Sequence, residues 1–392
     1  MGHYKYFNFL VDNLNVALGA LGLPELANEP VHLPIGISFF TFQAISYLVD
    51  IHRGDAKVQK NPLYLGLYIS LFPQLIAGPI VRYNMVDAEI RHRVITLAHY
   101  SQGIKLFCAG LFMKAAIADT MARIVDEALV QVPITDMGTG LAWLVIGSYT
   151  LQIFFDFAGY SLMALGLGRM FGFTFPINFN QPYISTSIRE FWRRWHISLS
   201  SWFRDYLYIP LGGSRGSSLT VYRNLLIVFF VTGLWHGASW NFVIWGLWHG
   251  LFIVLERNSV IGGTLDRLPF LIRRGYLLLV VIIGWVFFRI ESLPDALAVL
   301  KRMFWWTPVP ETASVLADPR HYLDGWVMAI AALAIVWSFI SPERGRWLAD
   351  RLGPAGSGLR EAVLSLGSLI LFAIAAALVV AGSYTAFIYF RF

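Results

Sequence analysis

Charged residues are scarce in this chain of 392 residues. Asp, Glu, Lys and Arg make up 14% of the chain, hydrophobic residues make up 57%, and the mean hydropathy is +0.59. An ordinary soluble domain carries roughly 25% charged residues, so this composition indicates an integral membrane protein. The net charge of +6 is spread through the loops rather than gathered into a basic patch, which argues against nucleic-acid binding.

Cysteine and strand-like patterns are also nearly absent. The sequence has a single cysteine, Cys108, which excludes an internal disulfide, and its apolar neighbours predict a buried, inert thiol. The alternating apolar pattern of a membrane barrel is missing, and hydrocarbon offers no partner for open backbone groups, so the spanning segments must be helical. We therefore predict an all-α, polytopic membrane protein. No repeat or long linker divides the chain, so residues 1–392 are expected to form one membrane-embedded domain.

Long apolar runs predict the spanning helices, since each approaches the about 20 residues that a bilayer requires. These runs lie at 33–50, 63–80, 140–157, 219–236, 239–255, 275–289, 325–340 and 362–381. With a more polar stretch at 100–118, they correspond to a bundle of about 8–10 transmembrane helices. Basic loops flank both ends of the second run, but the densest group of arginines lies at 189–223. We place that side toward the cytoplasm.

The most informative segment is 178–213, NFNQPYISTSIREFWRRWHISLSSWFRDYLYIPLGG. If 188–204 is one helix, an apolar face opposes a cationic stripe that includes a histidine. The stripe holds Arg189, Arg193, His196, Ser200 and Arg204, and the apolar face holds Ile188, Phe191, Trp192, Trp195, Leu199 and Trp202. Such a helix can lie in the headgroup layer with its charged side chains reaching water. Alternatively, its guanidinium groups can bind the phosphate oxygens of a polyanion through paired, charge-assisted donors.

A second histidine, His236, ends the apolar run at 219–236. Ionisable residues inside a membrane are functional candidates by default, and burial favours the neutral imidazole that a general base requires. The alternative is a core histidine bonded to a backbone carbonyl. Gly233 and Gly237 bracket His236 and are expected to leave room for a substrate beside the ring. His249 has a similar WHG context but no polar face, so we expect it to be structural.

Asp156 lies in an aromatic span, LQIFFDFAGYS. An unpaired carboxylate at a helix centre costs roughly 2.5 to 3.5 kcal/mol, so Asp156 should have a partner. We expect that partner to be an arginine of the 189–204 stripe or a histidine, forming a charge clamp rather than a proton carrier. Asn178 and its polar neighbours precede the stripe, where they can cap the helix or line a polar entrance.

Several motifs occur in a fixed order: FNQPYIS, EFWRRWHISLSSWFRDYLYIPLGG, YRN and LWHGASWNFVIWGLWHG. In this order they resemble the membrane-bound O-acyltransferase superfamily, and most closely its bacterial alginate O-acetylation branch. FDFAGYS, LPIGISFFTFQAISYLVD and LIAGPIVRY extend the resemblance over nearly the whole chain. Two features depart from the branch. The chain starts near the KYxNFF-like segment, without the further N-terminal helices of the branch, and Leu162 stands where the branch usually has Asp.

The resemblance implies a helical bundle with a tunnel, a cytoplasmic acyl donor and an acceptor reached from the other face, in a multi-pass protein of the bacterial inner membrane. It implies that His236 and His196 are catalytic. The residues expected to bind substrate or donor are Arg189, Arg193, Arg194, Trp192, Trp195, Asn178, Asp156, Tyr160 and Asn241. Acetyl-CoA is the expected donor, with no tightly bound cofactor and no metal. The expected partners are membrane lipids and exported acetyl-accepting proteins, through which the group reaches a polysaccharide.

Other functions remain open at this point. Within the same superfamily, the acceptor can be alginate, peptidoglycan or cellulose, or the reaction can be D-alanyl transfer to teichoic acid, although IPLGG and LWHGASW favour acetylation. A proton-coupled transporter would use Asp156, His196 and His236 as a relay, but inverted repeats are not evident. A non-catalytic membrane scaffold would need these histidines only for structure.

Overall fold

The computed structural model describes residues 1–27, 29–34, 36–76, 78–341, 343, 350–351, 357–382 and 386–387. Every regular element in these ranges is helical, which confirms the predicted all-α class. The α-helices are α1 (Phe7–Ala20), α2 (Ile37–Arg53), α3 (Pro62–Ser70), α4 (Phe72–Leu75), α5 (Tyr83–Arg91), α6 (Leu97–Phe112), α7 (Asp119–Gln131), α8 (Thr139–Met170), α9 (Ile188–Arg194), α10 (Ile197–Phe203), α11 (Ser218–His236), α12 (Trp240–Arg257), α13 (Ser259–Arg267), α14 (Phe270–Arg289), α15 (Leu293–Phe304), α16 (Gly325–Phe339) and α18 (Gly358–Val380). Short 3₁₀ or π-helical segments are η1 (Gly2–Tyr6), η2 (Met113–Ala118), η3 (Ile134–Asp136), η4 (Pro182–Ile184), η5 (Arg204–Tyr208), η6 (Val315–Ala317) and η7 (Pro319–Tyr322).

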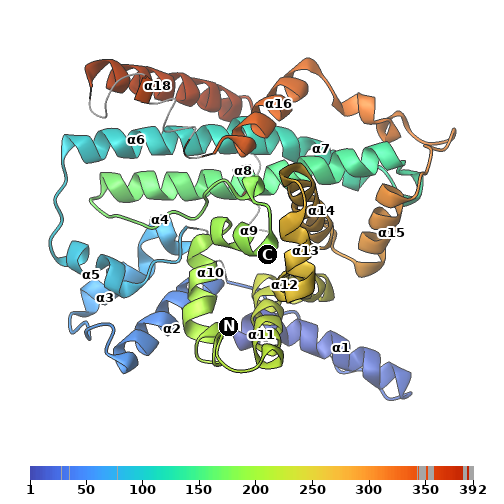
Figure 1. The fold of residues 1–392 in the computed structure, drawn as a ribbon, viewed down its shortest axis with the longest axis horizontal. Coiled ribbons are helices and arrows are strands. Elements are labelled where there is room, and N and C mark those ends of the chain that lie inside the picture. Colours follow the sequence, from blue (N-terminus) through green and yellow to red (C-terminus); the bar gives the residue numbers. More distant parts are fainter. Residues whose placement is uncertain are drawn as a thin grey trace.

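The longest helix, α8, is the centre of the fold. Its 32 residues are apolar on all sides, and most of its side chains are buried, as expected of a helix surrounded by other helices. One side is covered by α6, η2 and α7, which follow one another along the chain, and α18 packs on α6. Figure 1 shows α18, the α6–α7 run and α8 as successive layers.

Glycines set the close approach of α6 and α8. A Cβ on Gly103 would lie 2.6 Å from the backbone oxygen of Gly166, and one on Gly110 would lie 2.5 Å from that of Gly159. In lipid, helices associate through van der Waals packing, and small residues allow their backbones to come this near. Substituting any of these four glycines should push the two helices apart.

The second half of the fold is a hairpin of α11 and α12 with α14 packed against α12. The chain turns between α11 and α12 at 237–239, directly after His236. The short helices α9 and α10 lie between this hairpin and α8 (Figure 1), where Trp195 contacts Phe154 of α8 and Trp192 contacts Phe229 of α11. Helices α9 and α10, which belong to segment 178–213, therefore lie between the helices packed around α8 and the α11–α12 hairpin.

Four described helices are long and apolar enough to cross a membrane: α8, α11, α14 and α18. The apolar helix α16 is shorter. The predicted continuous span at 63–80 is wrong, because α3 ends at Ser70 and Pro73, which lacks an N–H, opens the separate α4. The stretch at 100–118 is helical throughout, and Cys108 within it is buried as predicted.

Candidate active site

The predicted helix over 188–204 is interrupted at His196. Helix α9 ends at Arg194, and His196 has a left-handed backbone with φ 43° before α10 begins at Ile197. Such a φ is uncommon outside glycine and costs of order 1–3 kcal/mol, so the surroundings must impose it. Two backbone hydrogen bonds do so: Asn180 N donates to Arg194 O, and Ile197 N donates to Asn178 O, each at 2.9 Å. The single two-faced helix expected from the sequence is therefore wrong.

Asn178 determines how the His196 ring is oriented. Its Oδ1 accepts hydrogen bonds from the Ser198 backbone N at 3.2 Å and from Ser198 Oγ at 2.8 Å, and it lies 3.2 Å from His196 Nδ1. A backbone N–H can only donate, so the atom facing it is the amide oxygen, and His196 Nδ1 must then carry the proton. Nε2 is consequently the basic nitrogen of the ring. His196 lies outside the four spanning helices, and burial lowers its pKa to about 3, so the ring is neutral.

His236 is the last residue of α11 and is buried among aromatic rings. Ring centroids of Trp235, Trp245 and Phe288 lie 4.8, 4.9 and 5.2 Å from its own. The indole of Trp235 also lies 6.3 Å from the His196 ring. One tryptophan, Trp235, thus lies close to both predicted catalytic histidines.

The glycines beside His236 serve packing. A Cβ on Gly233 or on Gly237 would collide with Phe242, with its backbone oxygen in the first case and its ring in the second. The space that these glycines were expected to leave for a substrate is therefore filled by Phe242. His249 is fully buried, and its ring centroid lies 5.3 Å from those of both Trp192 and Trp245. The structural role expected for it stays a prediction.

A cavity of about 280 Å³, the arginine cavity, opens between α9, α10, η5 and the α11–α12 hairpin. Four exposed arginines contribute to its lining: Arg189, Arg193, Arg204 and Arg257. The remaining lining is mostly apolar and includes the buried Trp192, Leu199, Phe203, Val228, Phe229 and Ile253. The cavity therefore combines cationic side chains at the surface with an apolar interior, which suits a ligand with an anionic head and a slender, less polar arm.

The cavity follows one face of α11 toward His236. Leu225, Val228 and Thr232 all line it, and residues three or four apart share a helix face. Thr232 precedes His236 by four residues, about one helical turn, and His236 itself is not among the lining residues. Thr232 is itself fixed, because its hydroxyl donates to Val228 O at 2.7 Å.

Three of the predicted donor-binding residues differ in their placement. Trp192 lines the cavity, but Trp195 lies in the core, with its ring centroid 5.0 Å from that of Trp285. Both tryptophans are buried in the protein, so neither anchors the helix at a membrane interface. Arg194 is not part of the cavity lining. Its guanidinium donates to Glu190 Oε1 at 3.0 Å and to Asn180 O at 3.1 Å.

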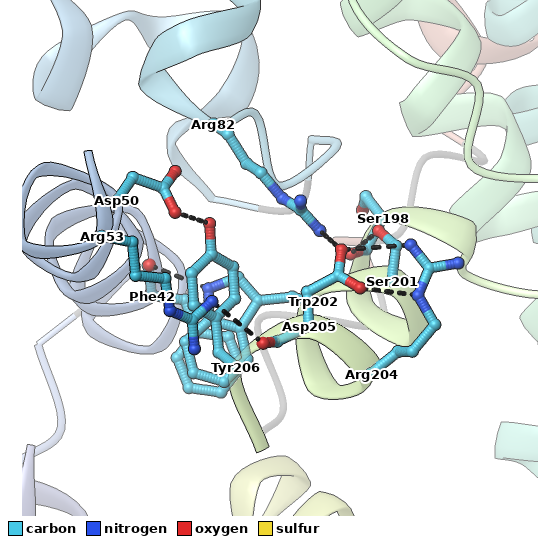
Figure 2. Close-up of polar contacts among 10 residues, drawn as sticks. All are labelled: Phe42, Asp50, Arg53, Arg82, Ser198, Ser201, Trp202, Arg204, Asp205 and Tyr206. Carbon is cyan, nitrogen blue, oxygen red and sulfur yellow. Dashed lines mark hydrogen bonds and ion pairs between the residues drawn. The ribbon is translucent and has the colours of Figure 1, made fainter. Parts of the chain in front are cut away.

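Arg204 is held in place by a polar network around Asp205 (Figure 2). Asp205 Oδ2 accepts from Arg82 at 2.6 Å, and its Oδ1 accepts from Arg204 Nε at 2.6 Å. Burial alone would raise the pKa of Asp205, but the two guanidinium groups outweigh it and hold that pKa below its ordinary value. Next to it, Tyr206 donates to Asp50 on α2 at 2.6 Å, and Arg53 donates to the Asp205 backbone oxygen. The network anchors η5 to α2 and to the start of α5.

Asp156 is paired with a residue that the sequence did not suggest. Lys114 Nζ lies 2.7 Å from Asp156 Oδ1 and 2.7 Å from Asp119 Oδ1, and all three side chains are buried. The expected partner, an arginine of the stripe or a histidine, is therefore wrong. Lys114 lies in η2, where the wider π-helical turn interrupts the run from α6 to α7.

Neither Asp156, Tyr160 nor Asn241 lines the arginine cavity. The Tyr160 ring lies 4.9 Å from that of Phe387, and Asn241 donates to Ile290 O, which ties α12 to the end of α14. Asn178 acts through His196. The structure thus brings Arg189, Arg193 and Trp192 together at the cavity and keeps Asn178 with His196. Neither histidine is itself among the residues that line the cavity.

The family model of the membrane-bound O-acyltransferase family matches residues 37–290. This chain belongs to that family. The matched range contains both histidines, the Asp205 network and the whole cavity lining. The chain is therefore a multi-pass membrane protein, as both its family and its long apolar helices indicate.

Curated relatives in the family are named for different acceptor polymers. The probable alginate O-acetylase AlgI of Azotobacter vinelandii is 45% identical over 78% of this chain and 60% of its own length. The peptidoglycan O-acetyltransferase of Helicobacter pylori is 37% identical over 77% of this chain and 62% of its own length. The teichoic acid D-alanyltransferase of Streptococcus thermophilus is 31% identical over 57% of this chain and 56% of its own length. The chain therefore spans about 60% of the alginate relative it matches.

Sequence reasoning missed several residues around the site. Arg257 was not considered, although it ends α12 and lines the cavity. Lys114 belongs to the more polar stretch at 100–118, and its pairing with Asp156 crosses 42 positions, a separation that helical periodicity does not report. Lys5 was also missed. Its ammonium reaches the end of α11, and an isolated basic residue near a terminus gives no signal of that contact.

Proposed function

We propose that the chain transfers an acetyl group from a thioester donor to a hydroxyl acceptor, with the donor in the arginine cavity and His236 as the general base. The observation that carries this proposal is the cavity itself. It joins four exposed arginines to a mostly apolar lining that includes Thr232, one helical turn before His236. Family membership supports acyl transfer as the reaction class.

The dimensions of the cavity favour acetyl-CoA as the donor. Pockets that enclose a whole drug-sized ligand measure roughly 300–1,000 Å³, and this cavity measures about 280 Å³. It can therefore take the acetylated pantetheine arm but not the nucleotide. The nucleotide phosphates would remain at the surface, where Arg189, Arg193 and Arg204 offer charge-assisted donors.

The chemistry needs one proton to move and one acyl bond to be exchanged. Neutral His236 takes the proton of the acceptor hydroxyl, and the oxygen attacks the thioester carbonyl. The C–S bond then breaks and an ester forms. The departing thiolate takes the proton from His236, which returns to its neutral form. General base catalysis contributes roughly 10² to 10⁴ in rate. His196, with Nδ1–H directed to Asn178, presents Nε2 to the acceptor hydroxyl and orients it.

The alginate O-acetylase relatives support an exported polysaccharide as the final acceptor, most specifically alginate. The acetyl group would cross the membrane through the chain and pass to exported acetyl-accepting proteins. In this proposal the chain lies in the bacterial inner membrane, with the arginine cavity on the cytoplasmic side. Peptidoglycan acetylation and D-alanyl transfer are alternative outcomes within the family.

The donor assignment is tested by comparing two donors. Acetyl-CoA carries the nucleotide phosphates, whereas S-acetylpantetheine lacks them. In detergent-solubilised protein, a uronic-acid oligosaccharide stands in for the acceptor hydroxyl that the exported proteins would supply. With this acceptor, the double variant Arg189→Gln, Arg193→Gln should raise KM for acetyl-CoA on the order of tenfold or more. KM for S-acetylpantetheine should change little. Arg215→Gln, an exposed arginine outside the cavity, is the matched control.

Equal KM changes for both donors would contradict phosphate binding by these arginines. A wild-type protein that moves protons or solute across vesicles but transfers no acetyl group would favour the transporter. A protein that does neither, yet retains exported partner proteins, would favour the scaffold. Labelled acetyl-CoA, with and without those partners, distinguishes the three.

A further inference from the structure

The N-terminal residues bind the end of the helix that carries His236. The last carbonyls of an α-helix have no partner within the helix. On α11, Tyr6 OH donates to Leu234 O at 2.9 Å, and Lys5 Nζ donates to Trp235 O and, at 3.4 Å, to His236 O. Three consecutive carbonyls are thus bound by two neighbouring side chains from η1. Figure 1 shows the N-terminus lying beside α11.

Lys5 is held from a second side. Its ammonium also donates to Ser38 Oγ on α2 at 3.1 Å and lies 5.8 Å from the centre of the Trp235 ring. The side chain is buried, and burial lowers the pKa of Lys5 to about 8, so the charged form still predominates at neutral pH. A cation at this end of a helix interacts favourably with its dipole.

The same segment also holds the far side of the turn after His236. Trp240 Nε1 donates to Asn13 Oδ1 at 2.8 Å, and the Trp240 ring lies 5.7 Å from that of Phe9. The turn 237–239 is therefore flanked by contacts from residues 5–6 before it and from residues 9–13 after it. All of these N-terminal residues lie outside the family match at 37–290.

We propose that Lys5 is a positioning residue for acyl transfer, which holds the last turn of α11 and so keeps the His236 imidazole in place one turn beyond Thr232 of the arginine cavity. Tyr6 contributes to the same contact through Leu234. The inference rests on the proposed function, because it takes His236 as the general base. Lys5 itself does not touch the reacting atoms.

The test compares Lys5→Met with Lys5→Arg. Methionine keeps most of the length of the side chain but removes every donor, whereas arginine keeps the charge and the donors. Lys5→Met should lower kcat on the order of tenfold to a hundredfold with KM for acetyl-CoA nearly unchanged, because misplacing a catalytic group affects the reaction more than donor binding. Lys5→Arg should restore most of kcat. Tyr6→Phe should have a smaller effect in the same direction.

The matched controls are Lys57→Met and Tyr4→Phe, which change exposed side chains of the same types. Both should behave as wild type. If Lys5→Met raises KM and leaves kcat unchanged, or if Lys5→Arg is as impaired as Lys5→Met in a folded protein, the positioning role is wrong.

Backbone hydrogen exchange gives a second readout that does not need activity. In Lys5→Met, amides in 233–240 should exchange faster than in wild type, whereas those in α8 should not change. Unchanged exchange at 233–240 would overturn the contact. If wild type transfers no acetyl group at all, the proposed function fails, and the positioning of His236 by Lys5 is then judged by exchange alone.

Discussion

The amide oxygen of Asn178 lies 3.2 Å from Nδ1 of His196 and accepts two further hydrogen bonds from Ser198. This contact determines which nitrogen of the imidazole is basic. It also holds His196 at its left-handed backbone position between α9 and α10. A side chain eighteen positions earlier in the chain thus sets the chemistry that His196 can offer.

Replacing Asn178 with Ala should therefore affect activity as well as stability. The His196 Nδ1–H and the Ser198 donors would lose their acceptor, at a cost of about 1–3 kcal/mol for each buried group left without a partner. The ring could then adopt the other tautomer, so kcat should fall on the order of tenfold or more. Acetyl transfer and the thermal midpoint of the detergent-solubilised protein measure the two effects.

Ser198→Ala is the comparison for that variant. It removes one donor to Asn178 and the acceptor of Ile80 N, but it leaves the bond between Asn178 and His196 in place. The thermal midpoint should fall while kcat stays near wild type. Equal losses of kcat in both variants would show that the hydrogen bond to His196 has no special role.

Lys114 should be essential for folding rather than for chemistry. Its ammonium pairs with both Asp156 and Asp119 where all three side chains are buried. Removing one partner of a buried ion pair is expected to cost about 3–5 kcal/mol. Lys114→Met should therefore lower the yield of monodisperse protein in size-exclusion chromatography. Adding Asp156→Asn and Asp119→Asn should recover it, and a triple variant as poorly folded as the single one would contradict this account.

Asp205 should make part of the stability of the folded protein depend on pH in the acidic range. Its folded pKa lies below the ordinary value, so its contribution is present above about pH 4 and is lost as the pH falls through the folded pKa. The thermal midpoint of wild type should fall more between about pH 5 and pH 3 than that of Asp205→Asn. Parallel pH profiles for the two proteins would show that the ion pairs around Asp205 do not stabilise the fold.

The same variant tests how Arg204 is positioned. Without the carboxylate, Arg204 loses the partner that directs it at the cavity. KM for acetyl-CoA should rise several-fold, with a smaller change for S-acetylpantetheine. An unchanged KM for acetyl-CoA would show that the network serves stability only.

The helical class, the placement of His236 at the end of an apolar helix and the arginine-rich surface could all be predicted from the sequence, because periodicity and composition report them directly. The break at His196 could not. Its φ of 43° is imposed by Asn178 and Asn180, through hydrogen bonds that helical periodicity does not encode. Apolar residues recur with helical periodicity throughout 188–204, and this pattern favoured one uninterrupted helix.

Contacts between distant segments were equally out of reach. Glycines around His236 suggested open space, but Phe242 fills it. Asp156 was correctly expected to need a cation, and the physical argument failed only in choosing which one. Lys5 reaches α11 across 230 positions, so only the folded structure shows that the two segments meet.

The central claim is that His236 removes the acceptor proton while the donor occupies the arginine cavity. The most direct measurement is single-turnover transfer of labelled acetyl from saturating acetyl-CoA to a uronic-acid oligosaccharide by wild type, His236→Ala and the surface control His92→Ala. We expect His236→Ala to remain folded, to keep its affinity for acetyl-CoA and to lose transfer by roughly 10²-fold or more. His92→Ala should match wild type. Transfer by folded His236→Ala at the wild-type rate would contradict the account.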